Sequence, residues 1–508
     1  MSEAAQTPTD QFMSLPALIR QHSARFPEKL AVTDGETHLS YADFNNAMDR
    51  VAASLRRDGV KQGQVVALIS AASIEQLVAF LGALRAGCVT ALIQPSAAPE
   101  QICGMIGDSG AVLSFVDDAT ADAMGGHDVP GRAVRLTELS TWLVPDDAAA
   151  VEAEIEISPE DGFNIIYSSG TTGLPKGILL SHRMRWQQYL ASAVLNFGEA
   201  VTLVATPLYS NTTLTALLPT LGWGGSVLFM RKFDAHNYLE LAQAHRATHT
   251  MLVPVQYQRI MALPDFDSFD LSAFKVKTCT SAPFKAELKA DILKRWPGAL
   301  IELYGMTEGG GTTALYAHEF PHKLHTVGQP IPGHDIRLID DEGREVPRGE
   351  TGEVVGRSDL MMKGYHGRDQ ETSDAFWFSP EGYRFIRHGD VGRFDEDGFL
   401  VLMDRKKDMI ISGGFNIYPS DLEAVLAEHP AVAECAVIGV PSDQWGETPV
   451  AFYVPKADAN ASDAEVLAET NGRLGKTQRI SKLHSIDELP RSVIGKVLKR
   501  ELRDRLAL

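Results

Sequence analysis

Short apolar runs alternate with segments of helical spacing over much of the chain. Near the N-terminal end, Val65–Ile69, Val89–Ile93 and Val112–Phe115 have the length and composition of buried strands. Between them, Ser73–Arg85 and Pro99–Ser109 carry apolar residues at helical spacing. Strands that alternate with helices predict a parallel sheet covered by helices on both faces.

The same alternation returns after residue 200. The expected helices are Ala235–His245 and Pro283–Trp296, and the expected strands are Val201–Thr206, Val227–Met230, Thr248–Val253, Val276–Thr280 and Leu300–Leu303. Two such blocks predict a large α/β domain built from two subdomains stacked on each other.

The pattern changes twice in the remaining chain. From about Val327 glycine and proline become frequent, and short strands at Asp335–Ile339 and Gly352–Gly356 predict a small antiparallel β unit. A charged segment at Asp404–Asp408 is typical of an exposed linker. Beyond it, helix-like and strand-like segments predict a small, mobile α+β domain. We therefore expect an N-terminal domain over residues 1–404 and a C-terminal domain over residues 405–508.

Composition narrows the class of protein. A chain of 508 residues is too long for a single core. The formal net charge of −19 argues against nucleic acid or an anionic membrane as a partner. The longest apolar stretch is interrupted by Glu75, Gln76 and Arg85, so no transmembrane segment is expected, and Met1–Asp10 lacks the apolar core of a signal peptide. Four widely spaced cysteines suggest thiols in a reducing compartment, and we expect a cytoplasmic protein.

The most informative segment is Tyr167–Gly177, which reads YSSGTTGLPKG. It follows an apolar, strand-like run and contains three glycines, four Ser or Thr hydroxyls and one lysine. Glycines allow the backbone to approach phosphate oxygens, hydroxyls donate hydrogen bonds to them, and lysine neutralises their charge. The segment is not a Walker A loop, because Pro175 precedes Lys176 and no hydroxyl residue follows it. It predicts a loop that binds polyphosphate.

This loop resembles the phosphate-binding signature of the adenylate-forming superfamily, which includes acyl-CoA synthetases, adenylation domains and luciferases. Further motifs extend the resemblance over nearly the whole chain. They are Leu303–Glu308 (LYGMTE), His388–Asp390 (HGD), Arg405–Pro419 (RKKDMIISGGFNIYP) and Pro490–Lys496 (PRSVIGK). The resemblance implies an enzyme that activates a carboxylic acid with ATP and Mg²⁺, releasing pyrophosphate and forming an acyl-adenylate.

The resemblance also assigns roles to residues. It implies that Tyr304 stacks on adenine, Thr307 contacts the α-phosphate, Glu308 binds Mg²⁺ and Asp390 binds the ribose hydroxyls. With Lys176, Thr307 and Glu308, Lys496 would be catalytic, because a cation at the reacting phosphate is worth more in the transition state than in the ground state. The full expected ATP-binding set is Ser168, Ser169, Gly170, Thr171, Thr172, Gly173, Lys176, Ser281, Ala282, Pro283, Glu302, Tyr304, Gly305, Met306, Thr307, Asp390, Arg405, Asn416 and Lys496.

Other positions would hold the acid and CoA. Tyr209, Ser210, Asn211 and Thr212 match a segment that lines the acyl pocket, although Ser210 stands where many acyl-CoA synthetases carry histidine. Gly309, Gly310 and Gly311 would leave space for a bulky or long acid, and a merely flexible loop is an equally good reading. Gly413, Gly414 and Arg479 are candidates for CoA contacts, and Lys407 for the hinge of the C-terminal domain. His182, His245 and His249 show no metal-ligand spacing and are expected to be structural.

These observations favour an AMP-forming carboxylic acid–CoA ligase. The acid would be aromatic, bulky, or of medium or long chain, and the partners are the acid, ATP and CoA. The alternative is a stand-alone adenylation enzyme that loads an amino acid or aryl acid onto a carrier protein. No acidic residue occurs in Tyr209–Thr215 to bind a substrate amine, which disfavours amino acids. The oligomeric state is left open, with a homodimer as one alternative.

Overall fold

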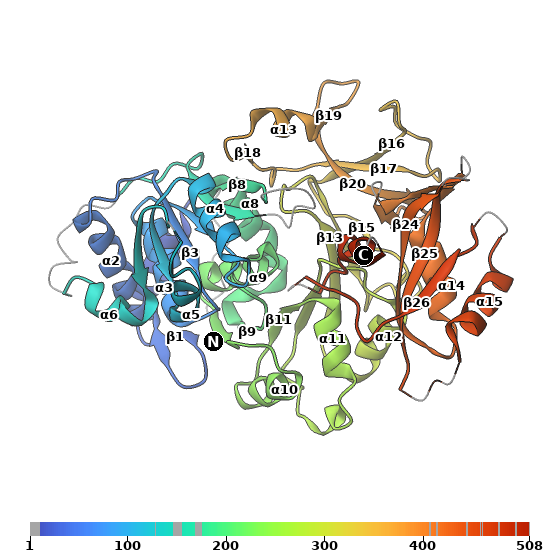
Figure 1. Cartoon of the computed structure of the whole chain (residues 1–508). Coiled ribbons are helices and arrows are strands. Elements are labelled where there is room, and N and C mark those ends of the chain that lie inside the picture. The colour runs from blue at the N-terminus through green and yellow to red at the C-terminus, as the bar shows by residue number, and fades with distance from the viewer. Residues whose placement is uncertain are drawn as a thin grey trace. The chain divides into compact units, whose positions relative to one another are not determined.

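The computed structural model describes residues 11–127, 129–145, 155–167, 175–405, 408–412, 415–442, 445–457, 459, 461–475, 478–492 and 495–506 (Figure 1). The chain forms two compact units. The first contains Met1–Leu324, Ile331–Asp335 and Arg357–Ile386, and the second contains the rest, including Arg387–Leu508. The second unit therefore takes in segments upstream of residue 405, and the domain boundary expected after Asp404 stays a prediction.

The first unit contains a seven-stranded sheet in the order β18-β8-β7-β4-β3-β5-β6. Its strands are β3 (Val65–Ile69), β4 (Val89–Leu92), β5 (Ala111–Val116), β6 (Arg132–Arg135), β7 (Gly162–Tyr167), β8 (Gly177–Ser181) and β18 (Gly364–Tyr365). The α-helices in this part of the chain are α2 (Tyr41–Arg57), α3 (Ile74–Arg85), α4 (Pro99–Ser109), α5 (Asp118–Ala123), α6 (Leu139–Trp142) and α8 (His182–Ala191). Strand β7 leads directly into the expected phosphate loop.

A second sheet of this unit contains, in order, β14, β13, β12, β11, β9, β10, β1 and β2. The strands are β1 (Leu30–Thr33), β2 (His38–Ser40), β9 (Val201–Val204), β10 (Ser226–Phe229), β11 (His249–Leu252), β12 (Val276–Cys279), β13 (Ala299–Gly305) and β14 (Thr312–Tyr316). The accompanying helices are α1 (Leu15–Arg25), α9 (Asn211–Trp223), α10 (Ala235–Ala244), α11 (Pro254–Met261) and α12 (Ala286–Arg295), whereas α13 (Asp369–Asp374) lies beside β18 of the first sheet.

One hydrophobic core joins the two sheets. It contains Leu68 and Phe163 from the first sheet, Val204 and Val227 from the second, and side chains of α2, α3, α8 and α9. The stacked arrangement expected from the sequence is thus confirmed. The strands expected from the sequence pair in parallel, as in β3–β4 and β12–β13, and the hairpins β1–β2, β7–β8 and β13–β14 add antiparallel strands at the sheet edges. Their connections are too short for the crossover that parallel strands require.

The second unit has two smaller sheets. One contains β16 (Asp335–Ile339), β17 (Gly352–Arg357), β20 (Arg384–Phe394) and β21 (Leu400–Arg405), and β20 also pairs with β19 (Phe376–Phe378). The other contains β22 (Ile410–Ser412), β23 (Phe415–Ile417), β24 (Val432–Ser442), β25 (Gly446–Pro455) and β26 (Lys482–Ser485). Its helices are α14 (Pro419–Ala427), α15 (Asp463–Arg473) and α16 (Lys499–Leu506), which supply Leu422, Leu426, Val466 and Leu502 to its cores. This is the expected small α+β fold.

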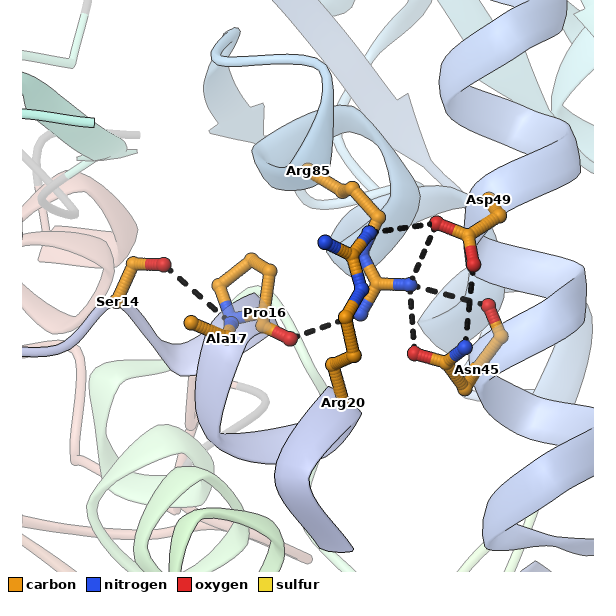
Figure 2. Close-up of polar contacts among 7 residues, drawn as sticks. All are labelled: Ser14, Pro16, Ala17, Arg20, Asn45, Asp49 and Arg85. Carbon is orange, nitrogen blue, oxygen red and sulfur yellow. Dashed lines mark hydrogen bonds and ion pairs between the residues drawn. The ribbon is translucent and has the colours of Figure 1, made fainter. Parts of the chain in front are cut away.

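A buried arginine ties three helices of the first unit together (Figure 2). Arg85, in the last turn of α3, donates from Nη1 to both Asn45 Oδ1 (2.7 Å) and Asp49 Oδ1 (2.8 Å) on α2, and from Nη2 to Pro16 O (2.8 Å) on α1. Arg20 also reaches Asp49 Oδ1, at 3.0 Å. These bonds fix the N-terminal helix against the helical layer, because a buried guanidinium is costly unless its donors are satisfied.

The first unit should lose stability in acid because of His182. This residue begins α8, lies edge-on against Phe163 and is 3 % exposed. Burial lowers its pKa to about 4, so the unfolded chain binds a proton more readily than the folded chain. The contribution of neutral His182 to the free energy of unfolding is fully present above pH 6.5. It falls by up to about 3 kcal/mol as the pH falls toward 4. In thermal unfolding from pH 7 to 4.5, His182→Gln should show a shallower fall in Tm, and the exposed His322→Gln the same fall as wild type.

Candidate active site

The expected nucleotide residues of the first unit lie at the carboxyl ends of two neighbouring strands. Strands β12 and β13 are parallel and adjacent, with Cys279 opposite Glu302. Ser281–Pro283 therefore leaves the sheet beside Tyr304–Glu308. The carboxyl edge of a parallel sheet is where open α/β folds bind ligands. Tyr304 and Thr307 are half-buried there, and Gly305 is exposed. The fold thus brings together two segments that the sequence proposed separately.

Ser281 has an unusual backbone. Its φ is +83°, in the left-handed region that residues other than glycine seldom adopt. Its hydroxyl lies 2.6 Å from that of Thr212, in the first turn of α9. Ser210 caps this helix by accepting from the Thr212 N–H. The hydroxyl pair therefore connects the expected acyl segment with the expected adenine segment, and strain of this kind concentrates at functional sites.

Tyr365 connects Glu308 with Lys176. The Tyr365 hydroxyl donates to Glu308 Oε1 at 3.0 Å, and the Lys176 Nζ lies 5.0 Å from the centre of the same ring. Sequence reasoning missed this residue, because β18 is two residues long and lies in a segment without a clear hydrophobic period. The contact places the expected metal-binding carboxylate and the expected phosphate-binding ammonium on one aromatic side chain.

The segment Ser358–His366, which we call the strap, forms hydrogen bonds both to the turn that carries Glu308 and to strand β8. Met362 N donates to Glu308 O (2.8 Å), and Ser358 Oγ donates to Gly309 O (2.7 Å). At its other end, Lys363 N donates to Leu179 O on β8, and His366 N donates to Gly177 O. The strap thus hydrogen-bonds to the strand that follows the phosphate loop and to the turn that carries Glu308.

The structure explains why position 309 is glycine, for a reason that the sequence did not indicate. Its φ is +78°, and a Cβ on this residue would lie 1.8 Å from the Leu360 carbonyl oxygen of the strap. Backbone packing therefore requires glycine here, whatever the acid. Gly310 and Gly311 are also buried. The proposal that glycine leaves room for substrate accordingly rests on these two positions rather than on all three.

The side chain of Glu302, which was expected to bind ATP, is buried and faces a lysine instead. Its side chain is only 4 % exposed and forms an ion pair with Lys289 of α12, which is equally buried. Burial raises the pKa of Glu302 to about 7, and Lys289 opposes that rise. A carboxylate committed to a buried lysine offers no contact to a nucleotide, so the predicted role could involve only the Glu302 backbone.

Several expected residues lie outside the described part of the chain. These are Ser168, Ser169, Gly170, Thr171, Thr172 and Gly173 of the phosphate loop, the hinge candidate Lys407, and the CoA candidates Gly413 and Gly414. The residue that precedes the loop makes contacts that the structure describes. Tyr167, the last residue of β7, donates its hydroxyl to Met105 O (2.9 Å) and Asp108 Oδ2 (3.0 Å). Asp108 also pairs with Arg368, at 3.0 Å.

The second unit brings two further candidates together. Asp390 on β20 and Arg405 on β21 stand opposite each other in the register of this antiparallel pair. Asn416 lies on β23 opposite Ile411. Arg479 is exposed beyond α15. All four roles remain predictions.

Lys496 sits in a short, well-anchored turn of the second unit. Ser492 N donates to Lys496 O, and Lys496 N donates to Ser492 Oγ. Arg491 donates to Gly495 O inside the turn (2.8 Å) and to Glu434 Oε2 on β24 (2.6 Å). Gly495 has a φ of +77°, which the turn requires. Arg491 is thus a positioning residue for the lysine, which the sequence motif did not reveal.

The side chains around Glu308 suit a magnesium ion that is bound together with ATP. They do not form a site in which protein side chains alone surround a metal ion. Within the described ranges, no group of three or more His, Cys, Asp or Glu side chains could hold a metal ion. Mg²⁺ is commonly bound through one or two carboxylates together with substrate phosphates and water. Glu308, half-buried beside Lys176 and Tyr365, fits that mode. Bound there with ATP, the ion would neutralise charge on the phosphates.

Comparisons with known proteins agree with these features. Residues 19–366 match the model of the AMP-binding enzyme family, and residues 421–496 match that of the AMP-binding enzyme C-terminal domain. A feruloyl-CoA synthase from Amycolatopsis sp is 34 % identical over 487 residues, covering 94 % of this chain and 96 % of the relative. A 4-coumarate–CoA ligase-like protein from Oryza sativa subsp. japonica is 31 % identical, covering 97 % and 92 %.

A solved structure leads to the same family. ATP-bound MatB from Rhodopseudomonas palustris superimposes with a TM-score of 0.86 at 30 % identity, covering 97 % of this chain and 99 % of that one. No helix in the described ranges is both long and apolar enough to cross a membrane. The enzymes of this family use ATP, Mg²⁺ and CoA. The chain belongs to the AMP-binding enzyme family and is an AMP-forming acid–CoA ligase.

Proposed function

We propose that this ligase activates an aromatic acid that carries a hydroxyl group, and transfers the acyl group to CoA. The observation that carries the proposal is the side chain of Asn211, the first residue of α9. Its Oδ1 is buried and accepts no hydrogen bond from any described residue. A buried acceptor without a partner is costly, and a ligand hydroxyl would satisfy it.

Neighbouring residues support an aromatic acid. Tyr209 is half-buried against the main core, and burial raises the pKa of its hydroxyl, so this side chain is neutral at all ordinary pH values. Thr212 is buried beside Ser281. An apolar wall with a few fixed polar groups is typical of a site for a small organic ligand. The similarity to a feruloyl-CoA synthase and to a 4-coumarate–CoA ligase points in the same direction.

In the first reaction step, a carboxylate oxygen would attack the α-phosphorus of ATP, and pyrophosphate would leave. Lys176 and Lys496 would balance the negative charge that grows on the transferring group. Glu308, positioned by Tyr365, would hold the Mg²⁺ that shields the phosphates. In the second step, the CoA thiolate would attack the acyl carbonyl carbon, and AMP would leave with the electrons of the broken C–O bond.

The role of Asn211 predicts a specific loss. Asn211→Val removes the acceptor and keeps a compact side chain, so kcat/KM for 4-hydroxycinnamate should fall by ~10-fold, corresponding to about one hydrogen bond to a neutral group. The value for cinnamate, which lacks the hydroxyl, should change little. Thr215→Val, one turn further along α9, serves as the control. A parallel loss for both acids would assign Asn211 to the fold rather than to the substrate.

A panel of acids tests the overall function. Pyrophosphate release should be highest with hydroxylated cinnamic or benzoic acids, and CoA should convert the adenylate into a thioester with release of AMP. Pyrophosphate release without any CoA thioester would favour the alternative, an adenylation enzyme that loads a carrier protein. We further propose that the enzyme acts in the cytoplasm; its four cysteines are free thiols.

A further inference from the structure

An ion pair of the first unit lies beside the strand that leads into the phosphate loop, and none of the roles proposed above uses it. Asp108 is in the last turn of α4, and Arg368 follows the strap. Arg368 Nη2 lies 3.0 Å from Asp108 Oδ1, and the two side chains are 25 % and 19 % exposed. Because 260 positions separate the two residues in the sequence, the pair exists only in the folded chain.

The stability of the fold alone does not explain this pair. Asp108 stands in the last turn of a helix, where the helix dipole favours a positive charge over a negative one, and this turn of α4 contains no basic residue. An ion pair that is partly exposed to water contributes little to stability. The attraction of Arg368 is therefore largely offset by the unfavourable position of the carboxylate.

The Asp108 carboxylate reaches the residue that precedes the phosphate loop. Tyr167, the last residue of β7, donates its hydroxyl to Asp108 Oδ2 at 3.0 Å, while Oδ1 faces Arg368. Tyr167 and Gly177 are partners in the register of β7 and β8, and a Cβ on Gly177 would lie 3.3 Å from Tyr167 Cε1. One carboxylate thus contacts both Arg368 and the tyrosine at which the two ends of the loop meet.

Arg368 belongs to the turn that carries Tyr365. The Arg368 N–H donates to Tyr365 O at 3.1 Å. The Thr372 hydroxyl donates to Arg368 O (2.7 Å) and accepts from the Tyr365 N–H (2.9 Å). The Lys176 Nζ lies 5.0 Å from the centre of the Tyr365 ring. The arginine end of the ion pair therefore leads to the lysine that is expected to bind phosphate.

We propose that the Asp108–Arg368 pair positions both ends of the phosphate loop for the polyphosphate of ATP. Asp108 holds Tyr167, and Arg368 holds the turn against which Lys176 rests. Both are positioning residues, since each acts through another side chain. Groups that are already held in place bind a ligand more tightly, because less conformational entropy is lost on binding. The inference rests on the predicted contact between the loop and ATP, which is part of the function proposed above.

The test compares the dissociation constants of Mg·ATP and AMP for the full chain, in the absence of any acid. Asp108→Ala should weaken Mg·ATP by ~10-fold, the size expected for the loss of one hydrogen bond to a charged group. AMP carries a single phosphate and should bind almost as tightly as to wild type. In thermal unfolding, Tm should stay within about 2 °C of wild type, because the lost ion pair is offset by removal of the charge from the end of α4.

Variants of the arginine test whether the two residues act as a unit. Arg368→Gln should show the same selective loss for Mg·ATP, and Arg368→Lys, which keeps the charge, should retain most of the affinity. The double variant Asp108→Ala/Arg368→Gln should bind Mg·ATP about as well as Asp108→Ala alone. Glu371→Gln is the matched control, since Glu371 is a second carboxylate near Arg368, 3.7 Å from Nη1, and lies on α13. This control should bind both nucleotides as wild type does.

Tyr167→Phe keeps the test decisive if Asp108→Ala does not fold. It removes only the hydroxyl that donates to Asp108, and it should also weaken Mg·ATP more than AMP. Equal weakening of both nucleotides in these variants, or unchanged binding of Mg·ATP in all of them, would overturn the proposal. A wild-type chain that bound no Mg·ATP would instead contradict the proposed function itself, and the inference with it.

Discussion

Lys496→Ala is expected to slow adenylate formation by ~10²–10³-fold, the loss typical of a single electrostatic donor to a transition state. In this step an anionic carboxylate attacks an anionic phosphate, so negative charge accumulates on the transferring group. Thioester formation from preformed acyl-adenylate transfers no phosphoryl group and should be largely spared. The two half-reactions are measured separately, by pyrophosphate release and by CoA consumption from synthetic adenylate.

The turn around Lys496 supplies the comparisons for that experiment. Lys499→Ala removes a nearby lysine that pairs with Glu423 at 2.9 Å, and adenylation should remain close to wild type. Arg491→Gln loosens the anchor to Glu434 without touching the lysine, so it should give a smaller loss in the same half-reaction. If Lys496→Ala impaired both half-reactions equally, its role would be structural.

Glu308→Gln should give the second large effect, a loss of ~10²-fold in adenylation at low magnesium concentration. The substitution keeps the size of the side chain but removes the charge that a hard cation prefers. Raising the magnesium concentration should recover part of the rate, because the defect lies in metal binding. The measurement is pyrophosphate release over a range of Mg²⁺ concentrations at saturating ATP and acid.

Two variants separate this role from a general disturbance of the site. Tyr365→Phe removes only the hydroxyl that donates to Glu308 Oε1, so it should shift the magnesium dependence less than Glu308→Gln does. Glu319→Gln, an exposed carboxylate beyond β14, should leave that dependence unchanged. A Glu308→Gln enzyme whose lost activity did not respond to magnesium would contradict the assignment.

The sequence predicted the elements that are apolar and locally determined. Pro99–Ser109 was expected as a helix and is α4 with the same bounds, because its apolar residues recur at helical spacing, Pro99 stands at its first position and Gly110 ends it in the left-handed conformation. The expected strands of the second block all exist, with bounds shifted by up to two residues. What the pattern could not indicate is the placement of β1, whose parallel partner β10 lies almost two hundred residues away.

In the candidate site, too, local sequence motifs predicted some features, and others are visible only in the folded chain. Motifs identify Thr307, Glu308 and Lys496 as candidates, because a run of specific residue types carries that information. Tyr365, the Glu302–Lys289 ion pair and the requirement for glycine at position 309 depend on segments that meet only in the folded chain. A charged residue at the end of a strand is as consistent with a buried partner as with a ligand, and only the packing distinguishes the two.

The strap over Ser358–His366 limits how this enzyme can be redesigned by exchanging parts with relatives. A chimera that imports a new Glu308 turn alone would meet a strap whose backbone donors and Leu360 carbonyl fit the old one. A chimera that imports the strand pair around the phosphate loop alone would meet the same mismatch at Gly177 and Leu179. Productive crossover points should therefore keep these three segments from one parent, although the first ends at Ser181 and the last begins only at Ser358.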